Sequence, residues 1–329
     1  MKNWRKLVCL AMCIGLLVGC SDDDDDKVDV VPEPTSFKVS AYVNDLKFPL
    51  GADLDSKKNL WVSELGTGKD DGRILMITPS KNIVPFLEGL PSVVANGSIE
   101  GLSHVKVHQN KLYVMHGISG FLYVFDISNF TSSSSPQDLS KAQKIDFRTY
   151  VDSQDLVDPL NSNGYDVEVG PDGDLLVSDA GSNAIIRVKP SGDMSVFAKI
   201  PKASNGAEAV PTGVKWDGTH LYVSTLSGFP FSASEAVIYK ITSSGAVSEY
   251  KKGLSLLSNL NFTVGKKVIA TQLGVFGNTG FGDTSGKVVN EEGAVLAEGF
   301  GMPTDLVKID ERNFYIVNYL SGSIDKLSY

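Results

Sequence analysis

Apolar and polar residues alternate over short stretches along most of this chain, and no long segment keeps a helical period of 3.6 residues. The stretches are bounded by glycine, proline, asparagine and aspartate, which favour turns. Alternation with a period of two is typical of β-strands that bury one face. The pattern therefore predicts a mostly β protein, with a loop at 132–135 and one short helix within 147–157.

One apolar stretch recurs six times, each copy ending in a small or polar residue. The last residues of successive copies are 52, 63, 46, 47 and 46 positions apart. A repeat of about 40–50 residues is typical of propeller blades. We therefore predict an all-β fold, a six-bladed β-propeller. The six copies are Leu60–Glu64, Leu112–His116, Leu175–Asp179, Leu221–Thr225, Val268–Gln272 and Phe314–Asn318.

The surroundings of each copy predict four strands per blade. An apolar strand precedes each copy, and a tight turn separates the two, most clearly at Gly170–Gly173. A third strand such as Ala184–Val188 and a fourth such as Ser195–Ala198 follow. The sixth repeat stops after its third strand, at Ile324–Tyr329. Because the missing strand is present at Phe37–Tyr42, we expect the N-terminal strand to complete the last blade and close the ring.

The first twenty residues resemble a bacterial lipoprotein signal. Three basic residues precede Leu7–Val18, an apolar run shorter than the ~20 residues of a membrane-spanning helix. The run leads to Cys20, in a string that resembles a lipobox. We predict a signal peptide at 1–19, a lipidated Cys20 with an acidic tether at 20–35, and the propeller at 36–329. An uncleaved anchor helix is the alternative.

The acidic run Asp22–Asp26 follows the cysteine and resembles the surface-export signal of Bacteroidota lipoproteins. It predicts a lipid anchor in the outer membrane, with the protein exposed on the cell surface. Two other interpretations stay open. A charge run is often only a solvated tether, and 23–27 also matches an engineered protease site.

Composition narrows the class of partner. The chain has no cysteine after Cys20, so the exported protein has no disulfide framework. Removing the signal also removes Lys2, Arg5 and Lys6, which moves the net charge from -9 to -12. Such an acidic chain is a poor partner for nucleic acid. We expect a monomeric propeller that contacts the membrane through its anchor, with a surface glycan or a protein as a possible partner.

Candidate site residues gather where the first strand of each blade begins and the second ends. Propeller geometry brings these positions to one rim of the central channel. Polar groups framed by aromatic rings are typical of a small-ligand site, although a propeller channel can also be polar without a ligand. The predicted ligand-binding residues are Glu64, Glu100, His116, Asn163, Asp179, Thr225, Phe229, Phe231, Gln272, Asp305 and Asn318.

Two segments resemble the ScyD/ScyE family of propellers. Asn163–Tyr165 with Leu175–Asn183 is similar to the family's third blade, and Val210–Gly213 with Leu226–Phe231 to its fourth. The resemblance implies a six-bladed, TolB-like propeller and implies no reaction. We therefore favour a ligand-binding or protein-interaction scaffold that is not an enzyme.

The alternative is a metal-dependent hydrolase or lactonase. Glu64, Asn163, Asp179 and Asp305 offer oxygen ligands suited to Ca²⁺, and Asn163-Gly164 resembles an element of gluconolactonases and regucalcin. The glutamate of those proteins is absent from the first blade, where Pro49–Gly51 stands. The histidines lack zinc-site spacing, and no Gly-x-Ser-x-Gly motif occurs.

Overall fold

The computed structural model describes residues 31–95, 97–277, 280–281 and 284–329. The predicted signal, Cys20 and the acidic run lie outside this range. Among the described residues, no helix combines the length and the apolar content needed to cross a membrane.

Six four-stranded antiparallel sheets form a ring, which confirms the predicted propeller. Blade one holds β2 (Pro49–Leu54), β3 (Leu60–Glu64), β4 (Gly72–Ile77) and β5 (Ile83–Leu90). Blade two holds β8 (Leu102–His108), β9 (Lys111–His116), β10 (Phe121–Asp126) and β11 (Gln143–Asp146). Blade three holds β12 (Gly164–Val169), β13 (Leu175–Asp179), β14 (Ala184–Val188) and β15 (Met194–Lys199).

The remaining blades follow the same order. Blade four holds β16 (Pro211–Trp216), β17 (His220–Thr225), β18 (Ala236–Thr242) and β19 (Val247–Leu254). Blade five holds β20 (Leu257–Phe262), β21 (Val268–Gln272), β24 (Gly286–Asn290) and β25 (Val295–Phe300). Blade six holds β26 (Pro303–Lys308), β27 (Asn313–Asn318), β28 (Ser323–Ser328) and β1 (Lys38–Val43).

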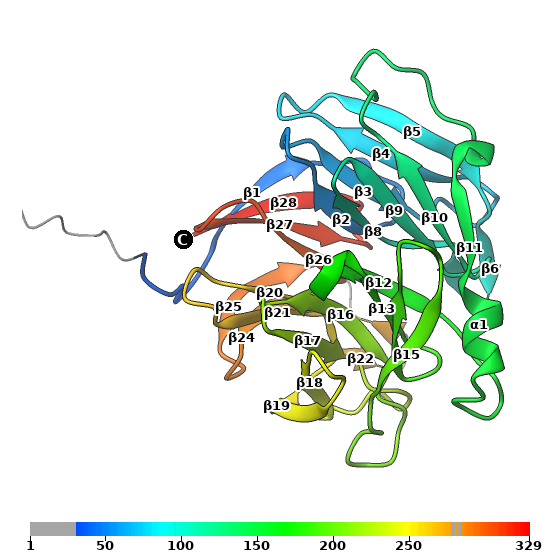
Figure 1. The fold of residues 1–329 in the computed structure, drawn as a ribbon. Helices are drawn as coiled ribbons and strands as arrows, with labels where there is room; N and C mark the ends of the chain where they lie inside the picture. The colour runs from blue at the N-terminus through cyan, green and yellow to red at the C-terminus, as the bar shows by residue number, and fades with distance from the viewer. Residues whose placement is uncertain (1–30, 96, 278–279, 282–283) are drawn as a thin grey trace, which may run out of the picture. The chain divides into compact units, whose positions relative to one another are not determined.

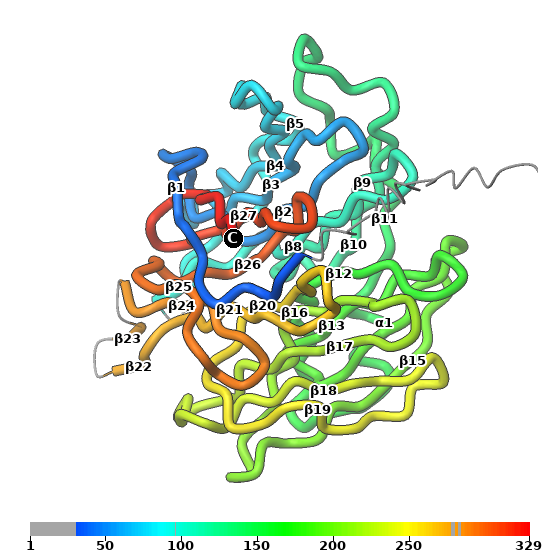
Figure 2. Tube along the Cα trace, turned by 90° about the vertical axis from the view of Figure 1, so that its left-hand side faces the viewer, coloured from blue at the N-terminus to red at the C-terminus, as the bar shows by residue number. Residues whose placement is uncertain are grey.

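The N-terminal strand closes the ring as the sequence predicts. β1 pairs antiparallel with β28, and Lys38 lies opposite Ser328. Figure 1 shows the blue β1 beside the red β28. The innermost strands contact one another in the order β2, β8, β12, β16, β20 and β26, and β26 returns to β2. Figure 2 shows these six strands around a common centre.

The remaining elements lie in the connections. The hairpins β6 (Val93–Ala95) with β7 (Ser98–Glu100) and β22 (Phe276–Gly277) with β23 (Gly280–Phe281) precede blade two and interrupt blade five. The predicted helix is α1 (Phe147–Ser153), whose first turn is capped by Asp146. Single turns of 3-10 helix are η1 (Leu139–Lys141) and η2 (Pro171–Gly173). Gly173 in η2 has a φ of 77°, as expected for the predicted tight turn.

The repeated stretch explains how blades join. Its apolar residues are buried between neighbouring blades, as Trp61 and Tyr222 are, with 1% and 6% exposed. In blades one and three its fourth position is a serine whose hydroxyl reaches the next blade's inner strand. Ser63 donates to the Ser103 carbonyl at 2.6 Å, and Ser178 repeats this bond on blade four. The motif therefore supplies packing between blades and, in blades one and three, a hydrogen bond to the next blade as well.

Candidate functional site

The inner strands line a channel with two cavities and a polar layer between them. The start-face cavity lies where the inner strands begin, and the end-face cavity lies where they end. Side chains of a strand alternate in direction, so residues two apart along each inner strand occupy successive levels of the channel. The middle layer holds His104, Asp166, Asn259 and Asp305.

The start-face cavity has a volume of about 310 Å³, and all six blades line it. Its walls are mainly apolar, which is typical of small-molecule sites. Residues from the successive blades and their connections include Leu50, Glu100, Asn163, Tyr165, Thr212, Leu226, Leu273, Phe281, Met302, Thr304 and Tyr319.

Glu100 is the one acidic residue that lines this cavity, and no lysine, arginine or histidine lines it among the described residues. Within the described part of the chain, no hydrogen bond or ion pair reaches the Glu100 carboxylate. Burial raises the pKa of Glu100 above its ordinary value. Burial together with the nearby charge of Glu100 also raises the pKa of Tyr319. The cavity therefore holds a half-buried carboxylate that no described cation or hydrogen-bond donor compensates.

Three further polar groups border the cavity. The Thr304 hydroxyl is buried and has no hydrogen-bond partner among the described atoms. Asn163 lines the cavity, while its backbone N–H donates to Asp179 at 3.2 Å. Burial raises the pKa of the Tyr165 hydroxyl well above its ordinary value. These groups offer hydrogen bonds to a bound molecule.

Two hairpins contribute to the rim. Glu100 ends the β6–β7 hairpin, and Phe281 ends β22–β23. Phe281 packs against Phe276 and Phe231, with ring centroids 5.1 and 5.7 Å apart. Phe229 continues this group and is 77% exposed. The connections on this face expose six large apolar side chains: Val93, Val94, Leu160, Phe229, Val275 and Leu320.

The middle layer separates the two cavities. His104 is fully buried, and its two ring nitrogens lie 3.1 and 3.2 Å from the carbonyls of Tyr165 and Thr304. Glycines make room for the large side chains. A Cβ on Gly51 would lie 2.6 Å from the His104 Cα, and one on Gly213 would lie 2.6 Å from the Asn259 Cα. Glycine is required at both positions because the neighbouring inner strand approaches so closely.

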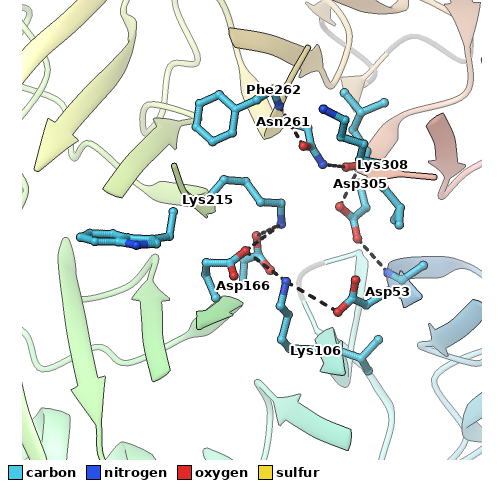
Figure 3. Close-up of a pocket in the computed structure, with 14 residues that line it drawn as sticks. Asp53, Lys106, Asp166, Lys215, Asn261, Phe262, Asp305 and Lys308 are labelled. Carbon is cyan, nitrogen blue, oxygen red and sulfur yellow. Dashed lines mark hydrogen bonds and ion pairs between the residues drawn. The ribbon is translucent and has the colours of Figure 1, made fainter. Parts of the chain in front are cut away.

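The end-face cavity has a volume of about 240 Å³ and is highly charged (Figure 3). Lys106 lies 3.1 Å from Glu168 and 3.6 Å from Asp53. Lys215 lies 3.5 Å from Asp166. Burial alone would lower the pKa of Lys106, but the two carboxylates beside it raise that pKa. Burial alone would raise the pKa of Asp166, yet Lys215 and neighbouring donors hold it below its ordinary value.

The acids of the end-face cavity also join neighbouring blades. Asp305 on blade six accepts the Ala52 backbone N–H on blade one at 2.8 Å. Asp53 accepts the Val107 N–H on blade two at 2.8 Å, and Asp166 accepts the Val214 N–H on blade four at 3.1 Å. Each of these carboxylates therefore has a structural partner. The acids that line this cavity therefore connect neighbouring blades of the ring.

The predicted site residues separate into groups. Glu100 and Asn163 line the start-face cavity, and Asp305 lies in the middle layer and lines the end-face cavity. Phe229 and Phe231 belong to the aromatic group beside Phe281. The six residues at the ends of the second strands line neither cavity: Glu64, His116, Asp179, Thr225, Gln272 and Asn318.

Those six residues bond within their own blade or the loop beside it. Glu64 accepts from Arg73 and from the Lys47 backbone N–H. Asp179 accepts from the Ser162 hydroxyl and from the Ser182 N–H, both at 2.7 Å.

The other four have similar roles. His116 bonds the Pro91 carbonyl at 3.1 Å, and Thr225 exchanges two bonds with Val237. Gln272 donates to the Ser255 carbonyl, and Asn318 donates to Asp325. His116 and Gln272 therefore bond connecting segments, and Thr225 and Asn318 bond the third strand of their own blade.

Sequence reasoning missed several residues of the channel. Tyr165, Thr304 and Tyr319 line the start-face cavity without having been predicted. The end-face charges were missed as well. Their signal is present in three inner strands, which carry polar residues two positions apart: His104 and Lys106, Asp166 and Glu168, and Asn259 and Asn261.

The predicted metal ligands do not fit a shared ion. Among the described residues, no three histidine, cysteine, aspartate or glutamate side chains lie together as a metal site. Glu64 is paired with Arg73, Asp179 is held by Ser162, and Asp305 lies beyond the cavity that Asn163 lines. The carboxylate oxygens of Glu64 and Asp179 therefore serve structural hydrogen bonds and ion pairs, and they do not converge on one ion.

Comparison with known proteins rests on structure alone. No family model matches the sequence, and no curated protein matches it. Virginiamycin B lyase from Staphylococcus aureus is similar in structure, with a TM-score of 0.53 and 13% identity over 89% of this chain and 100% of the lyase. A gluconolactonase from Xanthomonas campestris gives a TM-score of 0.55 and 11% identity, covering 89% of each chain.

A third structure is a protein of unknown function from Bacteroides thetaiotaomicron, with a TM-score of 0.58 and 11% identity over 89% of this chain and 72% of that one. These likenesses establish the six-bladed propeller fold. At such low identity they do not show that this chain shares the activity of any of these proteins. The ScyD/ScyE resemblance stays a prediction.

Proposed function

We propose that this protein is a propeller that binds a small molecule in its start-face cavity. The observation that carries the proposal is the composition of that cavity. All six blades line it with mainly apolar residues, and the polar groups of Glu100 and Thr304 there have no partner among the described residues. A concave apolar site with a few polar groups is the usual form of a ligand pocket. The end-face cavity is a weaker candidate because Lys106 and Lys215 in it are already paired with carboxylates.

The alternative, a metal-dependent hydrolase or lactonase, has less support. The gluconolactonase among the similar structures shares the fold at 11% identity. The oxygen ligands that such a reaction needs are dispersed here, as described above. We therefore derive no metal-dependent step, and binding is the function that the geometry supports best.

The proposed location is the outer surface of the outer membrane, through a lipid on Cys20. The support is the signal-like sequence before Cys20 and the acidic run after it. Radiolabelled palmitate should enter the wild-type protein but not Cys20→Ser in growing cells. Protease added to intact cells should digest the wild-type protein. A protein protected in intact cells and digested only after lysis contradicts surface exposure.

The binding function is tested with full-length protein and a thermal-shift screen of small molecules, glycans and divalent metals. Ala180 lines the start-face cavity, so Ala180→Phe should fill it and abolish the shift caused by any true ligand. Ala246 lies on an exposed turn, so Ala246→Phe is the matched control. If no compound raises the melting temperature, or if Ala180→Phe responds as the wild type does, the proposed function is wrong.

A further inference from the structure

The charge balance of the start-face cavity indicates the class of ligand. Glu100 is the single charged side chain among the described residues that line it. Its carboxylate has neither a cation nor a hydrogen-bond donor beside it in the described part of the chain. Glu100 is half-buried, and partial removal of water from a carboxylate without a partner disfavours its charged form. Retaining such a group in a cavity is typical of a binding site, where the ligand supplies the missing charge.

Aromatic rings surround the same space. Tyr165 from blade three, Phe281 from blade five and Tyr319 from blade six line the cavity. The face of an aromatic ring attracts a cation, and a nearby carboxylate adds to that attraction. Leu226 and Met302 complete an apolar wall. Carboxylate, rings and apolar wall together match a molecule that is positively charged at one end and apolar elsewhere.

We infer that the ligand is a small organic cation, an apolar or aromatic body that carries a protonated amine. Glu100 binds the amine, and the rings of Tyr165, Phe281 and Tyr319 surround the body. The Thr304 hydroxyl offers a further hydrogen bond at the same cavity. This inference rests on the proposed function of the start-face cavity. An anion is excluded from this role because no basic side chain lines the cavity among the described residues.

Three probes of matched size test the inference: 2-phenylethylammonium, 2-phenylethanol and phenylacetate. Their dissociation constants for the full-length protein are measured by calorimetry at pH 8, where both Glu100 and the amine are charged. We expect the cation to bind at least tenfold more tightly than the alcohol, because bonds to charged groups contribute roughly 1.5–3 kcal/mol. Phenylacetate should bind most weakly.

Variants test the charge of Glu100 and the space inside the cavity separately. Glu100→Gln should remove the tenfold advantage of the cation and leave the alcohol within about threefold of its wild-type affinity. Glu88 is an exposed acid on β5, so Glu88→Gln is the matched control and should change none of the three constants. Ala180→Phe should weaken the cation and the alcohol together.

A pH series adds an independent readout. Because the pKa of Glu100 is raised, affinity for the cation should fall on acidification before an ordinary glutamate would lose its charge, and affinity for the alcohol should not.

The outcomes are distinguishable. If the alcohol or phenylacetate binds as tightly as the cation, and Ala180→Phe weakens that binding, the cavity binds small molecules and the inference about charge is overturned. If Glu100→Gln keeps the preference for the cation, the inference is also overturned. If no probe binds, or if Ala180→Phe changes no constant, the inference fails together with the proposed function for these compounds.

Discussion

The two cavities of the channel differ in whether their acidic side chains have partners. In the end-face cavity, Asp53 and Asp166 each contact a lysine and accept a backbone N–H from the next blade. In the start-face cavity, Glu100 has none of these contacts among the described residues, and burial raises its pKa. The inner strands therefore pair their acids at one end of the channel, while at the other end the β6–β7 hairpin places an acid without a partner among the described residues. The difference teaches that a charged cavity is not by itself the better candidate for binding.

The largest expected effect comes from an acid of the end-face cavity. Asp166→Ala leaves the Val214 N–H without its partner and Lys215 with only Glu168, 4.0 Å away, and removing one member of a buried pair costs about 3–5 kcal/mol. Asp166→Asn should lose less because it keeps a hydrogen-bonding side chain. Urea unfolding measures both. Glu298→Ala removes an exposed acid paired with Lys287 and should stay within about 0.5 kcal/mol of the wild type.

If Asp166→Ala is as stable as the wild type, the end-face contacts do not stabilise the ring, and the contrast between the two cavities is wrong for the end-face cavity.

The next effect concerns pH and a residue beside the start-face rim. Burial lowers the pKa of His116 from 6.5 to about 4, so the native protein keeps this ring neutral while the unfolded chain takes up a proton. Stability from His116 is therefore present above pH 6.5 and is lost as the pH falls toward 4, by on the order of 2–3 kcal/mol. Thermal unfolding at several pH values should show a smaller acid loss in His116→Gln. Identical pH profiles contradict the assigned structural role.

A smaller effect tests the layer between the cavities. Gly51→Ala places a Cβ 2.6 Å from the His104 Cα, and overpacking of this kind costs about 1–3 kcal/mol. Gly101→Ala is the control at the start-face cavity, because its Cβ would meet nothing closer than 3.4 Å. Melting temperatures of the two variants should differ clearly, with Gly51→Ala lower. Equal melting temperatures indicate that the strands around His104 can move apart to accept the added Cβ at little cost.

The smallest effect has the opposite sign. Because the folded-state pKa of Glu100 is raised, the ionised carboxylate destabilises the native protein at neutral pH. Glu100→Gln should therefore raise the melting temperature of the ligand-free protein, by on the order of 1–2 °C. The gain should vanish at a pH below the ordinary glutamate value of 4.5, where the folded and unfolded states are both protonated. A lower melting temperature at neutral pH indicates a stabilising partner for Glu100.

The propeller was predictable because the same local signals recur in every blade. Each copy of the repeated stretch carries apolar residues for the space between blades, and the blade order follows from the order of the copies. Closure by β1 was predictable for the same reason, since one strand was missing at the end and present at the start.

The candidate site was only partly predictable. Glu100 and Asn163 were found because they stand at the beginnings of inner strands or just before them. Asp305 was placed at the rim, yet its neighbour Thr304 lines the start-face cavity instead, because a shift of one residue along a strand reverses the direction of the side chain. The packing of Phe281 against Phe231 could not be predicted from the sequence, because it depends on the β22–β23 hairpin.

The strand that closes the ring also fixes the order in which the protein is completed. Ser40 on β1 bonds Lys326 on β28, and 286 positions separate them. Contacts between residues so distant in sequence form slowly, since a long loop must close first. During synthesis, β1 emerges before any blade and has no partner until β28 has been made. Blade six can therefore be completed only after almost the whole chain has been synthesised. A chain released early from the ribosome would be an open ring with exposed strand edges, a form that chaperones and proteases recognise.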